Sequence, residues 1–238
     1  MVAFAFLTRL PIRAGVISDD DLGRSVGFFP LVGLVLGFAI AGLAYGADRL
    51  FPPAMTAVLV AIALAAVTGG LHLDGLSDLF DGLGGGHGDR DKTLAIMRDS
   101  RIGAQGAVAV FLALAAKIAA LTTLIEAGDF LALAAIPVIG RFAVGPAIVL
   151  FPYARAEGLG RAFNGRARLP QLVIAAVITA TVIASLGPTL LPAALGALGV
   201  ALALAVALRI YLGGLTGDIY GAIIEIAEVA AAFLCVLR

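Results

Sequence analysis

Residues 54–82 read AMTAVLVAIALAAVTGGLHLDGLSDLFDG, an apolar run long enough to cross a membrane and, directly after it, three aspartates. Asp74, Asp78 and Asp81 have the spacing i, i+4, i+7. On a helix, Asp78 and Asp81 fall about 40° and 20° to either side of Asp74, so the three carboxylates share one stripe. Carboxylates held this closely repel one another, and Mg²⁺ is a usual counter-charge where only oxygens are offered. The stretch therefore predicts a membrane helix that leads into a magnesium site.

The composition is that of a polytopic membrane protein. Of the 238 residues, 61% are hydrophobic and 13% are charged, and the mean hydropathy is +1.08. At roughly 20 residues per crossing, the chain has room for six or seven spans and no separate soluble domain. We expect an all-α, polytopic integral membrane protein with about six to seven transmembrane helices, in which residues 1–238 form a single transmembrane catalytic domain. The formal net charge of zero gives no general attraction to nucleic acid.

Basic residues lie almost all on one side of the predicted spans. Twelve of the 16 precede the first span, lie in the two long links between spans, or follow the sixth span, whereas Arg49 and Arg238 lie opposite. The positive-inside rule then places the amino terminus and both long links in the cytoplasm. The spans are expected near residues 28–45, 54–70, 103–125, 130–151, 172–186, 188–208 and 215–237.

A second acidic set lies in the last predicted span. Asp218, Glu225 and Glu228 share one helix face, and Glu228 lies roughly 15 Å along the helix from Asp218. An ionised carboxylate at that depth is costly unless it faces a partner or a water-filled cavity. Lys117 and Arg141 are the basic residues within spans. They could pair with the two glutamates as structural ion pairs, or all four could line a functional cavity, which is the reading we favour.

The pattern as a whole indicates phosphoryl transfer. Carboxylates on two helices that open to one side suit metal ions gripping a diphosphate, and arginines suit the remaining phosphate oxygens because their fork binds two at a time. Residues 97–103 and 153–168 supply such arginines. His72 could ligate metal, orient a carboxylate or cap the span interface. Gly84–Gly86 is expected to be a flexible turn that breaks the acidic helix.

Five separated blocks resemble the cobalamin synthase family, the adenosylcobinamide-GDP ribazoletransferases, and they follow in the right order from end to end. They are Phe6-Leu7-Thr8-Arg9-Leu10-Pro11; Gly70 to Asp78 with Asp81-Gly82; Ile96 to Gly103; Tyr153-Ala154-Arg155 with Gly158-Leu159-Gly160; and Gly214 to Asp218 with Gly221-Ala222, Glu225 and Glu228.

The resemblance implies the last assembly stage of the vitamin B12 nucleotide loop. Such an enzyme joins adenosylcobinamide-GDP to α-ribazole, usually a benzimidazole nucleoside, or to its 5′-phosphate, releases GMP and uses Mg²⁺. It implies a multi-pass protein of a prokaryotic cytoplasmic (inner) membrane whose active site faces the cytoplasm. The expected partners are these two substrates and membrane lipids, with no nucleic acid; other cobalamin-assembly enzymes or a second copy of the chain stay open.

Site residues are assigned on the same basis. The catalytic residues are expected to be Asp81, Glu228, Arg98 and Arg101, with Glu228 or Asp81 taking the proton of the attacking ribose 3′-hydroxyl. The metal ligands are expected to be Asp74, Asp78, Asp81, Asp218 and Glu225. The substrate contacts are expected to be His72, Arg98, Ser100, Arg101, Arg141 and Arg155.

Two other functions remain open. A CDP-alcohol phosphotransferase also carries aspartates on a membrane helix, but it is expected to show Asp-Gly-x₂-Ala-Arg, and here Asp74-Gly75 is followed by Leu76, Ser77 and Asp78. A metal or ion transporter would use Glu225 and Glu228 as an intramembrane pathway. Product analysis separates the first from a cobalamin synthase, and metal flux into proteoliposomes tests the second.

Overall fold

The computed structural model describes residues 1–12, 15–163 and 165–237, and within these ranges the only β-type pairing is one isolated bridge between Tyr153 and Leu215. Six of the described helices are long and apolar enough to cross a membrane, and a bent pair can supply a seventh span. This confirms the all-α polytopic fold. The six are α3 (Phe29–Ala47), α7 (Ala104–Glu126), α8 (Phe130–Leu150), α9 (Leu169–Leu186), α10 (Leu191–Leu212) and α11 (Gly217–Val236).

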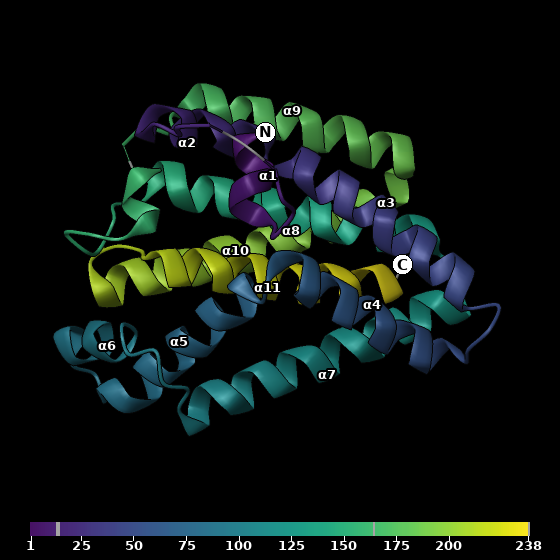
Figure 1. The fold of residues 1–238 in the computed structure, drawn as a ribbon, viewed down its shortest axis with the longest axis horizontal. Coiled ribbons are helices and arrows are strands. Elements are labelled where there is room, and N and C mark those ends of the chain that lie inside the picture. Colours follow the sequence, from purple (N-terminus) through teal and green to yellow (C-terminus); the bar gives the residue numbers. More distant parts are fainter. Residues whose placement is uncertain (13–14, 164, 238) are drawn as a thin grey trace.

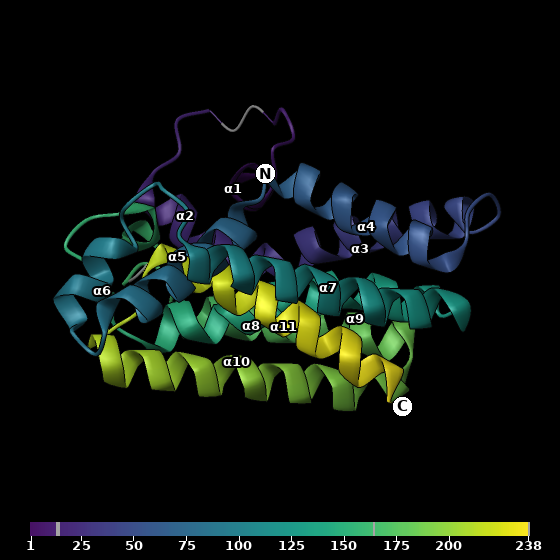
Figure 2. The same cartoon turned by 90° about the horizontal axis from the view of Figure 1, so that it is seen from below.

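Helix α8 lies inside the bundle (Figures 1 and 2), and 83% of its apolar window is buried. It packs against α3, α9, α10 and α11. Gly33 and Gly37 of α3 meet the backbone of α8 so closely that an added Cβ would overlap it. Small residues allow this approach in lipid, where packing rather than the hydrophobic effect holds helices together.

The apolar run and the aspartate stripe form two helices, α4 (Pro53–Thr68) and α5 (Leu71–Gly86), which meet at an angle of 89°. Gly69 and Gly70 both have left-handed backbone conformations, which cost glycine little, and they make this bend. The expected helix break at Gly84–Gly86 is wrong, since α5 continues to Gly86 and ends where His87 turns left-handed. These glycines instead allow close contact with residues of α6 (Arg90–Ile96) and α7.

Helices α5 and α11 cross at a pair of glycines. A Cβ on Gly75 would overlap the backbone of Asp218, and one on Gly221 would crowd Leu71 and His72. The bend between α4 and α5 therefore places the aspartates of α5 against the start of α11.

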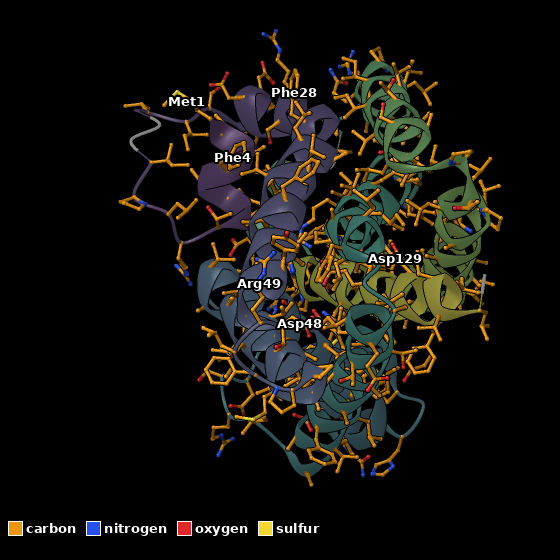
Figure 3. The ribbon with its side chains drawn as sticks, turned by 90° about the vertical axis from the view of Figure 1, so that its right-hand side faces the viewer. Met1, Phe4, Phe28, Asp48, Arg49 and Asp129 are labelled. Atoms are coloured by element: carbon orange, nitrogen blue, oxygen red, sulfur yellow. The ribbon has the colours of Figure 1, made fainter. Side chains whose placement is uncertain are left out.

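The remaining described elements are short. They are α1 (Val2–Leu7), α2 (Asp19–Ser25) and the 3₁₀ turns η1 (Val26–Phe28) and η2 (Leu159–Ala162), while η3 (Pro188–Leu190) joins α9 to α10. Figure 1 shows α6 at one end and the carboxyl terminus at the other. Asp48, Arg49 and Asp129 belong to the short connections at the second end (Figure 3).

Candidate active site

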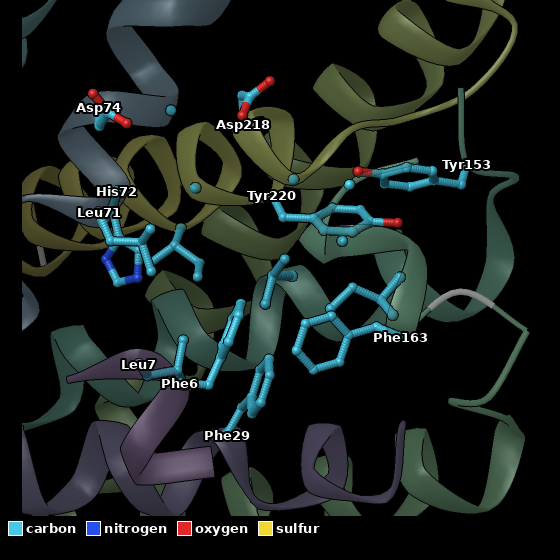
Figure 4. A pocket seen from close by; sticks show the side chains of 18 of the residues that line it. Phe6, Leu7, Phe29, Leu71, His72, Asp74, Tyr153, Phe163, Asp218 and Tyr220 are labelled. Carbon is cyan, nitrogen blue, oxygen red and sulfur yellow. The ribbon is translucent and has the colours of Figure 1, made fainter. Parts of the chain in front are cut away.

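Three aspartates from α5 and α11 form one electrostatic cluster, which we call the cleft carboxylates: Asp74, Asp78 and Asp218. Asp74 and Asp218 line the same cavity, and Figure 4 shows them on neighbouring helices above His72. The charges of both act on Asp78. The two acidic sets predicted from distant parts of the chain thus meet, but they do so through these three residues only.

The cleft carboxylates lack sufficient counter-charge. Asp78 lies on α5, after the apolar run has ended at the bend, and burial together with the charges of Asp74, Asp218 and Asp81 raises its pKa to about 7, although Arg155 opposes the shift. A carboxyl whose pKa is raised by like charges marks a place where a cation would be stabilised.

Arg155 is the cation beside this cluster. Its Nη1 lies 2.7 Å from Oδ2 of Asp218, and its side chain is only 9% exposed. Its Nε and Nη2 atoms are buried and have no hydrogen-bond partner. Backbone pairing of Ala154 and Pro152 with Leu215 fixes this loop to the start of α11. Unpaired guanidinium donors next to carboxylates suit an incoming phosphate, because a buried unpaired donor is costly.

Two cavities meet at this arginine. The first, which we call the aromatic pocket, has a volume of about 180 Å³ and is bordered by the rings of Phe6, Phe29, Tyr153, Phe163 and Tyr220, with His72, Asp74 and Asp218 among its polar residues. The second, which we call the basic groove, has a volume of about 630 Å³ and includes Arg155, Arg161 and Arg166. Tyr153, Arg155 and Gly158 belong to both, so the apolar space and the basic groove, which also includes Asp19, adjoin the same arginine.

The donor set fits a hard divalent cation. Among the residues that the structure describes, no three acidic, histidine or cysteine side chains form a ready metal cage. Mg²⁺, however, is commonly held by one or two carboxylates together with substrate phosphates and water. Asp74 and Asp218 face one cavity and supply oxygens of the required kind. Together with the raised pKa of Asp78, this geometry suits a metal that arrives with a phosphorylated substrate.

Asp81 points away from the other aspartates toward α7. Its two oxygens accept hydrogen bonds from the backbone N–H groups of Gly103 (2.7 Å) and Gly106 (2.8 Å) at the start of that helix. The carboxylate therefore caps α7, whose own N-cap residue offers no side chain. Its predicted metal and catalytic roles are not tested by this contact, but both oxygens already have partners.

Glu225 and Glu228 do not reach the cleft carboxylates. Lys117 pairs with Glu225 and lies 2.8 Å from Oε2 of Glu228, and Arg141 pairs with the other oxygen of Glu228. All four residues are less than 5% exposed. We call this set the buried ionic quartet. Its geometry is that of structural ion pairing, the alternative that the sequence disfavoured. The four residues also border a small cavity of about 20 Å³ together with His72, and the roles predicted for Glu225, Glu228 and Arg141 stay predictions.

The residues before α7 lie at the surface. Arg98, Ser100 and Arg101 are exposed, and Arg101 donates to both oxygens of Asp99, which lowers the pKa of Asp99 to about 2. In the described parts of the chain these three residues border neither the aromatic pocket nor the basic groove. His72, in contrast, is buried in the pocket wall, and its Nε2 has no hydrogen-bond partner.

Comparison with known proteins assigns the family. Residues 1–236 match the family model described as "Cobalamin-5-phosphate synthase". The chain belongs to the cobalamin-5-phosphate synthase family. Curated members of this family that are similar to the chain are named adenosylcobinamide-GDP ribazoletransferase. One from Syntrophobacter fumaroxidans is 44% identical over 95% of this chain and 93% of its own length, and one from Roseiflexus sp. is 40% identical over 96% and 85%.

A further relative with the same name, from Brevibacillus brevis, is 36% identical over 98% of this chain and 96% of its own length. No solved structure matches the chain.

In this cobalamin-5-phosphate synthase family member, four of the five blocks that carried the resemblance border the two cavities. The pocket takes Phe6 and Leu7 from the first block, Asp74 from the second, Tyr153 and Arg155 from the fourth and Asp218 from the last. The third block instead joins α5 to α7 through the bonds of Asp81. Sequence reasoning missed the aromatic pocket, because Phe29, Phe163 and Tyr220 are far apart in the chain and share no spacing.

Proposed function

We propose that the chain is an adenosylcobinamide-GDP ribazoletransferase. It joins the phosphate on the cobinamide side of adenosylcobinamide-GDP to α-ribazole or α-ribazole 5′-phosphate and releases GMP, which is the last assembly stage of the cobalamin nucleotide loop. The names of the relatives support the reaction. The observation that carries the site is the meeting of Asp74, Asp78 and Asp218 beside the buried, partly unpaired Arg155.

The residues of the cleft suit an in-line displacement at phosphorus. The ribose hydroxyl oxygen of the acceptor forms a new bond to the phosphorus on the cobinamide side, and the bond from that phosphorus to the bridging oxygen breaks. GMP leaves with the electron pair, and the hydroxyl proton passes to an ionised cleft carboxylate. Arg155 donates its unpaired N–H groups to phosphate oxygens while Asp218 holds its guanidinium in place.

Magnesium belongs to the same proposal. Asp74, Asp78 and Asp218 would hold Mg²⁺, which would neutralise the diphosphate and the leaving phosphate. The assignment differs from the sequence-based one, because Glu225 and Glu228 are neutralised by Lys117 and Arg141. Asp81 positions the start of α7 rather than supplying the base.

The location of the site also belongs to the proposal. The helices indicate a multi-pass membrane protein, and we place it in the inner membrane. The excess of arginine and lysine at the cleft end of the bundle supports a cleft that faces the cytoplasm. Both substrates carry large polar groups, and they reach the cleft from the aqueous side. Association with other assembly enzymes or with a second copy stays a prediction.

The test is a turnover assay of the purified, detergent-solubilised protein with adenosylcobinamide-GDP and α-ribazole, with Mg²⁺ added stepwise. We expect Mg²⁺-dependent release of GMP in equal amount to the new cobalamin product. Asp218→Asn should abolish release, whereas Asp129→Asn, at the opposite end of the bundle, should not. Release of CMP from CDP-diacylglycerol, or metal flux into proteoliposomes without any nucleotide, would support the rival functions instead.

A further inference from the structure

Three phenylalanine rings of the aromatic pocket come from separate parts of the chain. Phe6 lies in α1, Phe29 begins α3, and Phe163 follows η2. The ring of Phe163 packs edge-on against Phe6 (4.6 Å between ring centres) and against Phe29 (5.9 Å). Figure 4 shows the three rings grouped on one side of the pocket, with Tyr220 and Tyr153 on the next side.

The lining of this pocket selects the kind of group that fits. Apolar and aromatic side chains make most of the wall, and its carboxylates are confined to the side where α5 and α11 cross. A guanine base would leave several of its hydrogen-bonding groups unpaired against these rings, which is costly. A corrin macrocycle is far too large for a space of about 180 Å³. A flat, largely apolar bicyclic ring is small enough for this space and has few hydrogen-bonding groups to leave unpaired. It also stacks well on aromatic side chains.

We propose that the aromatic pocket binds the benzimidazole base of the acceptor nucleoside. This inference rests on the proposed function, and it deepens that function by assigning one cavity to one half of one substrate. Because Asp74 and Asp218 border the same pocket, a base seated among the rings places its ribose beside the carboxylates that take the proton.

The adjoining basic groove completes the placement. Tyr153, Arg155 and Gly158 border both cavities, so the two spaces adjoin at these residues. Phosphate groups of the substrates then reach Arg155 and Arg161 from the groove, whereas Arg166 is paired with Asp20. The aromatic pocket would therefore hold the uncharged base of the acceptor, and the basic groove would hold the charged groups of both substrates.

The experiment compares Phe163→Leu with Phe130→Leu. Phe130 also makes an edge-on contact, with Tyr45 at 5.5 Å, but at the opposite end of the bundle, so it serves as the matched control. The KM of each protein is measured for α-ribazole, for the corresponding imidazole nucleoside, for a purine nucleoside and for adenosylcobinamide-GDP. Phe6→Leu provides a second variant should Phe163→Leu fail to fold.

In the wild-type protein we expect α-ribazole to be preferred over both other nucleosides. Phe163→Leu should raise the KM for α-ribazole by about tenfold and weaken its preference over the imidazole nucleoside, because a ring contact of this kind contributes about that factor to binding. The KM for adenosylcobinamide-GDP should change by less than about twofold. Equal changes for both substrates, or the same change in Phe130→Leu, would overturn the inference.

A binding measurement separates this inference from the proposed function. Equilibrium dialysis with radiolabelled α-ribazole requires no turnover, and wild-type protein should bind it more tightly than Phe163→Leu does. Binding without GMP release would preserve the pocket assignment and reject the reaction. GMP release with binding that is indifferent to Phe163 and Phe6 would preserve the reaction and reject the pocket assignment.

Discussion

Helix α11 carries acidic residues in two regions whose surroundings differ completely. Near its start, Asp218 faces Asp74 and Asp78, and Arg155 is the guanidinium that offsets them. Two turns further on, Glu225 and Glu228 are buried against Lys117 and Arg141, one cation for each carboxylate. Acidic residue type and helix face are the same in both regions. The balance of charge around them separates a site that attracts a cation from a structural ion-pair network.

The largest expected effect comes from breaking the buried ionic quartet. Lys117→Met removes the cation that contacts both glutamates and leaves Arg141 alone against two buried carboxylates, which should cost about 3–5 kcal/mol of unfolding free energy. Thermal unfolding in detergent measures the loss, with Lys92→Met on the exposed face of α6 as the matched control. The double variant Lys117→Met with Glu225→Met should regain most of the stability, because Arg141 still pairs with Glu228. Equal stability of all four proteins would contradict this account.

Removing a charge from the cleft carboxylates should lower turnover without lowering the stability of the fold. Asp78→Asn keeps the side-chain shape and removes one of the repelling charges, so the fold should be as stable as wild type or more so. Turnover should fall about 100-fold or more, as for lost groups around a catalytic metal. GMP release measures the fall, and Asp48→Asn, in the short connection after α3, should leave turnover unchanged. Full activity in a folded Asp78→Asn protein would remove these carboxylates from the chemistry.

Binding of the divalent cation should depend on pH. Since the pKa of Asp78 is raised to about 7, this carboxyl is ionised above pH 7 and must lose its proton to bind a metal below it. The apparent affinity for Mn²⁺, measured by electron paramagnetic resonance as a probe for Mg²⁺, should therefore fall by up to about tenfold per pH unit below 7. It should level off above pH 8. An affinity that is constant from pH 6 to pH 8 would show that no cleft carboxyl titrates there.

The smallest expected effect tests whether Asp81 only caps helix α7 or also takes part in the reaction. Asp81→Ala frees two N–H groups of α7, and Asp89→Ala frees the N–H groups of Asp91 and Lys92 at the start of α6. Each should cost about 1 kcal/mol of unfolding free energy. Hydrogen exchange should rise at residues 103–106 in the first variant alone. A loss of turnover in Asp81→Ala far greater than in Asp89→Ala would restore Asp81 to the catalytic set.

The sequence predicted the membrane fold well, because spans are selected by apolar length alone. The expected spans end within a few residues of the observed helices, and Asp74 and Asp78 lie on the helix that their spacing indicated. It did not predict the bend at Gly69–Gly70, since neighbouring glycines permit a bend without requiring one. It favoured a functional cavity around Glu225 over ion pairing alone but could not decide between them, because the sequence does not show which residues of other helices lie beside this glutamate.

The sequence by itself determined that the chain is helical, crosses a membrane several times and carries more carboxylates than a membrane interior tolerates unpaired. These properties depend on residue type and on spacing along one helix. Only the tertiary structure decided that Lys117 and Arg141 neutralise the glutamates, that Asp81 caps α7, and that Asp74, Asp78 and Asp218 remain short of positive charge beside Arg155. Those outcomes depend on distances between helices, which the packing of glycines such as Gly75 and Gly221 sets.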